Sequence, residues 1–260
     1  MLEDDYCYVV RKALKGHGID LTTLAKRCMC TMEVLENWLQ GARNDDLARK
    51  VSAILQLKAD ALIHHASYLP KAQSSPSIHR IDLPFRDERV NAWLIWTHDA
   101  VMLFDTGFVR GTCMVAVDAM APPRIDHVWV THGHVDHIGG LTDFSQRGLD
   151  IRGPLGLGVK EIKAKESMRC GSLEVRAWDL SGHANPALGY QVLGLKSPVW
   201  VVGDALFAGS IGGCASPALY RHALARLHAV LDEQADDCVL LPGHGPATTL
   251  GEERAHNPFW

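Results

Sequence analysis

Residues 131–140 read THGHVDHIGG, and this stretch carries three histidines and one aspartate within six positions. The four side chains are those of His132, His134, Asp136 and His137. One regular element cannot wrap four donors so close in sequence around a single ion. If the stretch binds metal, we therefore expect further ligands from distant parts of the chain.

Four other polar residues stand where an apolar, strand-like run ends. LFDTG carries Asp105, WDLSGH carries His183, VVGD carries Asp204 and LLPGH carries His244. Side chains in such places lie on loops at the edge of a sheet, where neighbouring glycines allow sharp turns. Ligand sites in layered α/β folds are built from loops of this kind. These ends are predicted to converge with residues 131–140.

Taken singly, each of these residues is typical of a turn former or a capped polar group. The ordered series HxHxDH, GH, GD and GHG, each at a strand end, is improbable by chance and favours a metal site. His132 and His134 are two residues apart, so they face the same side of an extended segment. The predicted ligands are His132, His134 and His183 for one ion and Asp136, His137 and His244 for a second ion, with Asp204 bridging both.

Imidazole and carboxylate ligands without thiolate suit zinc, iron or manganese, and we expect two divalent ions, with zinc first among the three. Two ions roughly 3.5 to 4 Å apart can hold a bridging water and lower its pKa to about 7. The metal-bound hydroxide is then a nucleophile, while the second ion polarises a carbonyl. The pattern predicts hydrolysis of an acyl or related bond. Gly139 and Gly140 are expected to let the chain turn close to the ions.

The first part of the chain has a different character. Residues 1–66 show helical periodicity in four stretches, at 5–18, 20–28, 31–41 and 44–66. Asp20 and Thr31 are predicted N-terminal caps, and Gly16, Gly18 and Gly41 are predicted to end helices. The second and third stretches resemble a helix-turn-helix. Basic and acidic residues are equal in number in 1–66, and the third stretch carries acidic but no basic residues. This balance disfavours DNA binding and favours a bundle that packs or forms a homodimer.

Residues 67–77 (SYLPKAQSSPS) are predicted to be a linker. From residue 78 to 260, apolar strand-like runs alternate with helical stretches such as 112–120 and 216–234. Strands that are apolar on both sides imply sheets covered by helices, so we predict an α/β domain over 78–260 behind a small all-α domain over 1–66.

Composition limits the classes of partner. The chain has 260 residues, 22% of them charged, and a net charge of −4, which gives no case for an anionic membrane or nucleic acid as partner. The seven cysteines are odd in number and scattered, which fits unpaired thiols in a reducing compartment. The first residues lack the pattern of a secretory signal, and no apolar run approaches the length of a membrane span. We expect a cytoplasmic protein that acts on a small-molecule substrate.

Four stretches of the sequence carry a resemblance to a known family: THGHVDHIGG, SGH followed by LGY, GDALFAGSIGG and PGHGPATTLGEERAHNPFW. They resemble the metallo-β-lactamase superfamily and, within it, the glyoxalase II (hydroxyacylglutathione hydrolase) branch. The resemblance covers residues 78–260. It implies a four-layer αβ/βα sandwich with a dinuclear site at one edge and the ligand roles given above. It also implies that Asp105 supports the site, so Asp136 and Asp105 are the candidate catalytic carboxylates.

The chain departs from this branch in two loops. Gly182-His183-Ala184 lacks the threonine of the family's GHT, and Cys214-Ala215-Ser216-Pro217 follows GSIGG in place of arginine and an acidic loop. The metal site survives these changes, whereas specificity for glutathione thioesters does not. We therefore predict a metal-dependent hydrolase of a small thioester or ester.

Three alternatives stay open. The first is a persulfide dioxygenase that binds one iron through His132, His183 and Asp204, and the second is a lactonase. The third is a DNA-binding regulator with a metal-binding sensor domain. In an enzyme, the N-terminal helices would dimerise the protein or cover its cleft.

Overall fold

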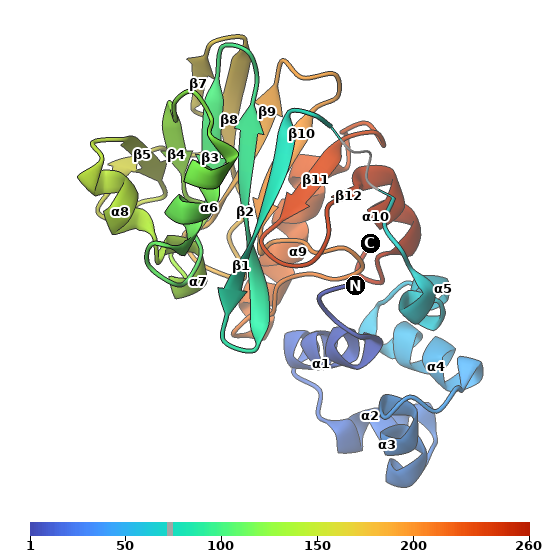
Figure 1. Cartoon of the computed structure of the whole chain (residues 1–260). Coiled ribbons are helices and arrows are strands. Elements are labelled where there is room, and N and C mark those ends of the chain that lie inside the picture. The colour runs from blue at the N-terminus through green and yellow to red at the C-terminus, as the bar shows by residue number, and fades with distance from the viewer. Residues whose placement is uncertain (72–74) are drawn as a thin grey trace.

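Two β-sheets face each other in the computed structural model, which describes residues 1–71 and 75–260 (Figure 1). In the first sheet the strands lie in the order β1 (Ile78–Phe85), β2 (Glu88–Trp96), β3 (Val101–Phe104), β4 (His127–Trp129), β5 (Asp150–Gly153) and β6 (Lys160–Glu161). In the second sheet the order is β12 (Thr248–Thr249), β11 (Val239–Pro242), β10 (Val199–Gly203), β9 (Leu188–Leu193), β8 (Leu173–Asp179) and β7 (Ser167–Cys170).

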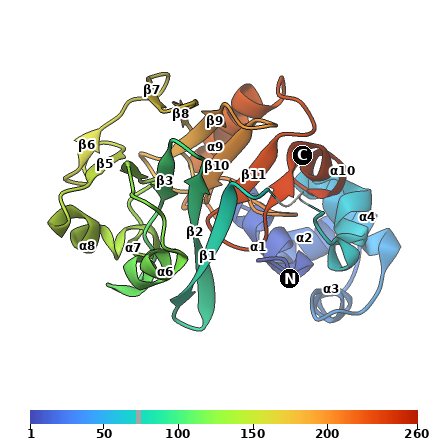
Figure 2. The ribbon, with the colours of Figure 1, turned by 45° about the horizontal axis from the view of Figure 1, so that its top comes forward.

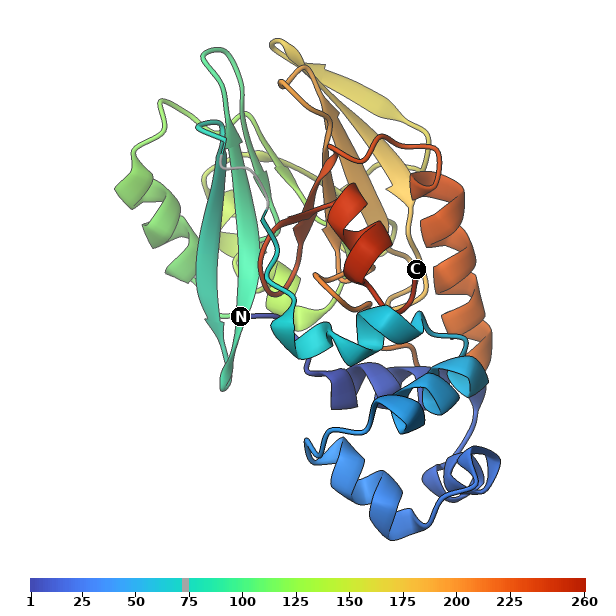
Figure 3. The same cartoon turned by 90° about the vertical axis from the view of Figure 1, so that its right-hand side faces the viewer.

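Helices cover the outer faces of both sheets, and Figure 3 shows the layers edge on, with α6 outside the first sheet and α9 outside the second. The helices of this part are α6 (Thr112–Met120), α7 (Val135–Ile138), α8 (Leu141–Gln146), α9 (Pro217–Leu231) and α10 (Leu250–His256). The predicted four-layer αβ/βα sandwich with helices ahead of it is thereby confirmed.

Strand β2 shows why the sheets form. Trp93 and Ile95 pack between the two sheets, whereas Ala92 and Leu94 pack on the opposite face, toward the outer helices. Successive side chains of a strand point to opposite faces, so a strand covered on both sides is apolar throughout. The continuous apolar run in β2 is the sequence signature of this burial.

The N-terminal helices gather at one end of the sandwich, beside α10 and the end of α9 (Figure 2). They are α1 (Tyr6–His17), α2 (Leu21–Cys28), α3 (Met32–Leu39), α4 (Asp45–Leu55), α5 (Ala59–Ile63) and the 3-10 helix η1 (His65–Ser67). The predicted caps are confirmed, because the side chains of Asp20 and Thr31 accept hydrogen bonds from the backbone N–H groups of Thr23 and Val34.

Two details of the helical prediction are wrong. The stretch 44–66 is not one helix, because Gln56 adopts φ 54° and Lys58 donates its backbone N–H to the carbonyl of Pro258 at 2.7 Å. Gly16 is not a stop, since α1 continues to His17. A Cβ at Gly16 would lie 2.4 Å from the ring of Tyr220 in α9, so glycine is required here for close packing.

The N-terminal helices and the second sheet share one hydrophobic cluster. Val9 and Leu55 from the helices pack in it with Trp200 and Leu240 from β10 and β11. The assignment of residues 1–66 and 78–260 to separate domains stays a prediction, and the predicted linker 67–77 includes residues 72–74, which lie outside the described residues. Across the described ranges, no helix has the length and hydropathy needed to cross a membrane.

Candidate metal centre

All seven predicted donors lie together on loops that follow strands, or on the short helix α7. Their ligand atoms form two groups, within each of which all atoms lie within 4.8 Å of one another. The first group is His132, His134, His183 and Asp204, and the second is Asp136, His137, Asp204 and His244. These are the same two groups that the sequence predicts, with Asp204 shared between them.

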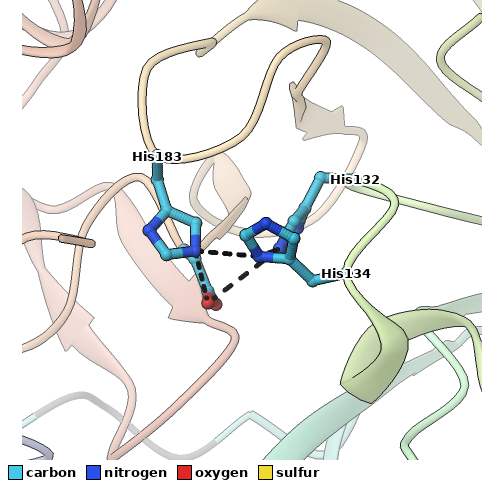
Figure 4. Close-up of side chains that lie close together, drawn as sticks. His132, His134 and His183 are labelled. Atoms are coloured by element: carbon cyan, nitrogen blue, oxygen red, sulfur yellow. Dashed lines mark hydrogen bonds and ion pairs between the residues drawn. The ribbon is translucent and has the colours of Figure 1, made fainter. Parts of the chain in front are cut away.

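In the first group the three imidazole rings converge on a carboxylate (Figure 4). His134 Nδ1 lies 3.1 Å from His132 Nε2 and 3.0 Å from His183 Nε2, and Asp204 Oδ2 lies 3.4 Å from His183 Nε2. Nitrogen ligands of a tetrahedral zinc ion, at about 2.0–2.1 Å from it, lie roughly 3.3 Å from one another. The observed spacing of the ring nitrogens fits such an ion.

In the second group the donors come from helix α7 and from the loops after β10 and β11. His244 Nε2 lies 3.2 Å from Asp136 Oδ2 and 3.6 Å from Asp204 Oδ2, and His137 Nε2 lies 3.3 Å from Asp204 Oδ1. Asp204 therefore presents one oxygen to His137 and the other to His183 and His244. A carboxylate placed in this way has the geometry needed to bridge two ions.

The outer nitrogen of four histidines is held by an acceptor. His183 Nδ1 lies 2.7 Å from the Gly213 carbonyl, His244 Nδ1 lies 2.7 Å from the Arg89 carbonyl, and His137 Nδ1 lies 2.8 Å from Asp105 Oδ2. Carbonyls and carboxylates only accept hydrogen bonds, so each Nδ1 carries a proton and each Nε2 faces into the group, where it can bind an ion once it is free of a proton. Histidine ligands of metals are oriented in this way.

His132 follows the same rule through Thr131. The Thr131 hydroxyl donates to Asp105 Oδ2 at 2.8 Å, so it accepts from His132 Nδ1 at 3.0 Å. Asp105 also accepts the backbone N–H of Thr131 at 2.8 Å. The Asp105 carboxylate thus lies behind His137 and Thr131, where its hydrogen bonds can orient both side chains.

Two buried atoms of the site explain why a metal fits here. His137 Nε2 and Asp204 Oδ1 are almost fully buried and face each other at 3.3 Å as an ion pair, but neither atom makes a hydrogen bond to a described residue. Polar atoms that are buried without a partner destabilise a fold unless a water or an ion satisfies them. Both atoms belong to the second donor group, so a divalent cation at this group would satisfy them.

Charge in the metal-free site is balanced by protons. Burial lowers the pKa of His137, but the carboxylates of Asp204 and Asp105 outweigh burial and raise this pKa well above its ordinary value. Burial likewise lowers the pKa of His244, but the hydrogen bond with Asp136 and the charge of Asp204 raise the pKa to about 9. Both imidazoles therefore carry an extra proton at neutral pH, on the nitrogen that faces the group.

Metal binding is expected to release these protons. Adding zinc to the metal-free chain at pH 7.5 should release protons, because the pKa values of His137 and His244 are raised and both side chains must lose a proton before they can bind an ion. The release should fall at pH values above 9, where His244 is already neutral. Calorimetry in buffers of different ionisation enthalpy measures the number. Zinc binding without proton release would contradict this description of the site.

Sequence reasoning missed one buried residue of this site, Asn91 in β2. Its Nδ2 donates to the carbonyls of Pro242 and Gly245, each at 2.9 Å, and its backbone N–H donates to the Gly243 carbonyl at 2.7 Å. These bonds hold the loop that carries His244. An amide side chain inside the otherwise apolar run VNAWLIW is the signal that could have identified it.

The role expected of Gly139 and Gly140 needs correction. Gly139 has φ −60° and Gly140 has φ −90°, values that any residue adopts. A Cβ at Gly139 would instead lie 1.9 Å from the carbonyl oxygen of Phe108. Glycine is required because this backbone packs directly on the loop after β3, next to Asp105.

Comparison with known proteins agrees with this site. The sequence profile of the metallo-beta-lactamase superfamily matches residues 86–153, which contain four of the donors. The uncharacterized protein ML0493 of Mycobacterium leprae is 31% identical over 198 residues, which cover 57% of this chain and 88% of that protein. The hydroxyacylglutathione hydrolase GloC of Haemophilus influenzae is 27% identical over 157 residues, covering 50% of this chain and 73% of that protein.

Solved structures show the same fold. The BLEG-1 B3 metallo-beta-lactamase aligns with a TM-score of 0.58 at 21% identity, over 70% of this chain and 99% of that one. Sequence profile, relatives and fold point to the same conclusion. The chain belongs to the metallo-β-lactamase superfamily.

Proposed function

We propose that this protein is a metal-dependent hydrolase of a small thioester or ester, similar to glyoxalase II. The observation that carries the proposal is the pair of donor groups that share Asp204, with each of four histidines fixed so that its Nε2 faces inward. Members of this superfamily are typically hydrolases, and a relative with 27% identity is named as a hydroxyacylglutathione hydrolase.

Two divalent ions in these groups would supply a water of lowered pKa and a Lewis acid for the substrate carbonyl. The first group would hold one ion through His132, His134 and His183, the second would hold the other through Asp136, His137 and His244, and Asp204 would contact both. Zinc suits this set of nitrogen and oxygen ligands, as do iron and manganese.

The chain itself supplies orientation and proton transfer. The bonds from the four outer ring nitrogens keep the histidines in one rotamer and one tautomer, so the site is organised before substrate arrives. Asp136 is the carboxylate that we assign to accept the proton of the attacking water. It then passes this proton to the sulfur or oxygen that leaves when the acyl bond breaks.

We propose small thioesters and esters as substrates, instead of glutathione thioesters alone, because the chain departs from the glyoxalase II pattern around His183 and after Gly213. Ala184 replaces the threonine of that branch, and residues 214–217 replace its arginine and acidic loop. These segments border the first donor group, since His183 and the Gly213 carbonyl are hydrogen-bonded at 2.7 Å. Loops at this position would select the substrate.

Metal analysis combined with a substrate panel tests the proposal. We expect about two ions per chain and turnover of at least one of S-lactoylglutathione, simple thioesters and esters. Turnover should disappear on chelation and return when zinc is added. The panel also contains lactones and glutathione persulfide. A single iron per chain, with oxygen uptake on the persulfide, would contradict hydrolysis and support a dioxygenase, and turnover of lactones alone would identify a lactonase.

The alternative hypothesis of a regulator that binds DNA through its N-terminal helices predicts a different result. Helix α3 exposes Glu33 and Glu36, so this face would repel phosphate. We expect no shift of DNA fragments in a gel at low salt, while the panel shows turnover. Retarded DNA without turnover of any substrate would support the regulator.

A further inference from the structure

The segment 205–213, called here the 205–213 loop, adjoins two donors of the candidate metal centre. It begins directly after Asp204, the carboxylate shared by the two groups. It ends at Gly213, whose carbonyl accepts the hydrogen bond from His183 Nδ1 at 2.7 Å. The position of this loop therefore sets the orientation of the His183 ring.

Two side chains from the N-terminal helices hold the backbone of this loop. Lys12 in α1 donates from Nζ to the Ile211 carbonyl at 2.8 Å and lies 4.9 Å from the centroid of the Phe207 ring. His65 in η1 is 1% exposed, and its Nε2 lies 2.9 Å from the Gly209 carbonyl, to which it donates. Gly209 and Ile211 are buried, so their carbonyls depend on these donors.

The contacts around the loop continue on both sides. Lys12 forms an ion pair with Asp4, and the exposed fractions of the two side chains are only 16% and 8%. The Gly209 N–H donates to Glu253 Oε2 at 2.9 Å, and the Tyr68 hydroxyl donates to Glu253 Oε1 at 2.7 Å. The loop is thus fixed between residues 4–68 and helix α10.

The N-terminal residues also approach the second donor group. Glu3 Oε1 lies 3.7 Å from His244 Nδ1, and a Cβ at Gly245 would lie 3.2 Å from the Glu3 nitrogen. The chain ahead of α1 therefore packs on the loop that carries His244, while α1 itself reaches the 205–213 loop. One segment of the chain contacts the supports of both groups.

We propose that the N-terminal helical segment braces the metal centre, with Lys12 and His65 as positioning residues that act on His183 through the 205–213 loop. This inference rests on the proposed function, because it presumes that the donors bind metal. Groups that orient a metal ligand typically change metal affinity by about 10- to 100-fold when they are replaced. The N-terminal helices would then be needed for metal binding, in addition to packing.

Two independent variants test the brace. Lys12→Met alone would leave Asp4 buried without its partner, so the double variant Asp4→Leu/Lys12→Met removes the pair together. His65→Phe removes the other donor and leaves no buried charge. Lys15→Met and His64→Phe are matched controls, because these two neighbours are exposed. Lys12→Arg keeps a cationic donor and should retain wild-type behaviour.

The readout is the zinc dissociation constant of each ion, measured by competition with a chromophoric chelator, together with the absorption spectrum of the cobalt-substituted protein. We expect the ion at the His183 group to bind about 10- to 100-fold more weakly in both variants, with an altered cobalt spectrum. Circular dichroism checks that each variant is folded. If the double variant is unfolded, the zinc affinity and cobalt spectrum of His65→Phe alone test the brace. Unchanged affinities and spectra in folded variants would overturn the brace. A wild-type chain that binds no metal would instead overturn the proposed function.

Discussion

Replacing Asp204 with asparagine is expected to reduce kcat for the hydrolysed substrate by about a thousandfold. Asp204 is the one donor that belongs to both groups, and its two oxygens face His137 on one side and His183 and His244 on the other. Metal-assisted catalysis contributes several kcal/mol to the barrier, and each 1.36 kcal/mol is tenfold in rate. Loss of the shared ligand should therefore affect both ions at once.

Steady-state kinetics and metal content of the same preparation measure this effect. We expect fewer than two ions per chain in the variant and full occupancy in Asp46→Asn, which changes an exposed carboxylate of α4. If Asp204→Asn kept wild-type kcat and metal content, the carboxylate would not be a shared ligand.

Replacing Asp105 with alanine is expected to lower the free energy of unfolding of the metal-free protein by about 3–5 kcal/mol. This carboxylate is 2% exposed and accepts hydrogen bonds from the Thr131 N–H, the Thr131 hydroxyl and His137 Nδ1. Its removal leaves the cationic His137 imidazole without one of its two carboxylate partners. Loss of one member of a buried ion pair typically lowers the free energy of unfolding by about 3–5 kcal/mol. Urea unfolding at neutral pH measures the change.

The same variant should bind zinc about 10- to 100-fold more weakly, since Asp105 orients His137 directly and His132 through Thr131. Asp118→Ala is the matched control. It removes an exposed carboxylate that pairs with Arg147 at the surface, and such pairs contribute at most about 1 kcal/mol. Equal stability of the Asp105 and Asp118 variants would contradict the role given to Asp105.

The sequence predicts those elements whose signal is local. The strand-like runs that were predicted from residue 78 onward begin with β1, and the helical stretch that was predicted at 112–120 coincides with α6. The residues of the two groups could be predicted because five of them stand near the end of an apolar strand and beside a glycine, and Asp136 and His137 follow in the same short stretch. Strand β5 (Asp150–Gly153) was not predicted, since Ile151 is the one apolar side chain larger than glycine in its four residues, too little for a strand signal.

Other features depend on contacts between distant segments, and no local pattern could reveal them. The sequence pattern predicts that Gly16 ends a helix, but its lack of a side chain instead allows α1 to pack closely against Tyr220. Lys12 reads as an ordinary helical lysine until the fold brings the Ile211 carbonyl within 2.8 Å. The helices were predicted from periodicity, whereas their contact with the candidate metal centre arises only in three dimensions.

Anomalous diffraction from crystals of the full chain grown with zinc tests the central claim most directly. The claim predicts two peaks at the zinc edge, one within reach of His132 Nε2, His134 Nδ1 and His183 Nε2, and one within reach of Asp136, His137 Nε2 and His244 Nε2, with Asp204 between them. Peaks elsewhere on the molecule, with these side chains free of metal, would contradict it.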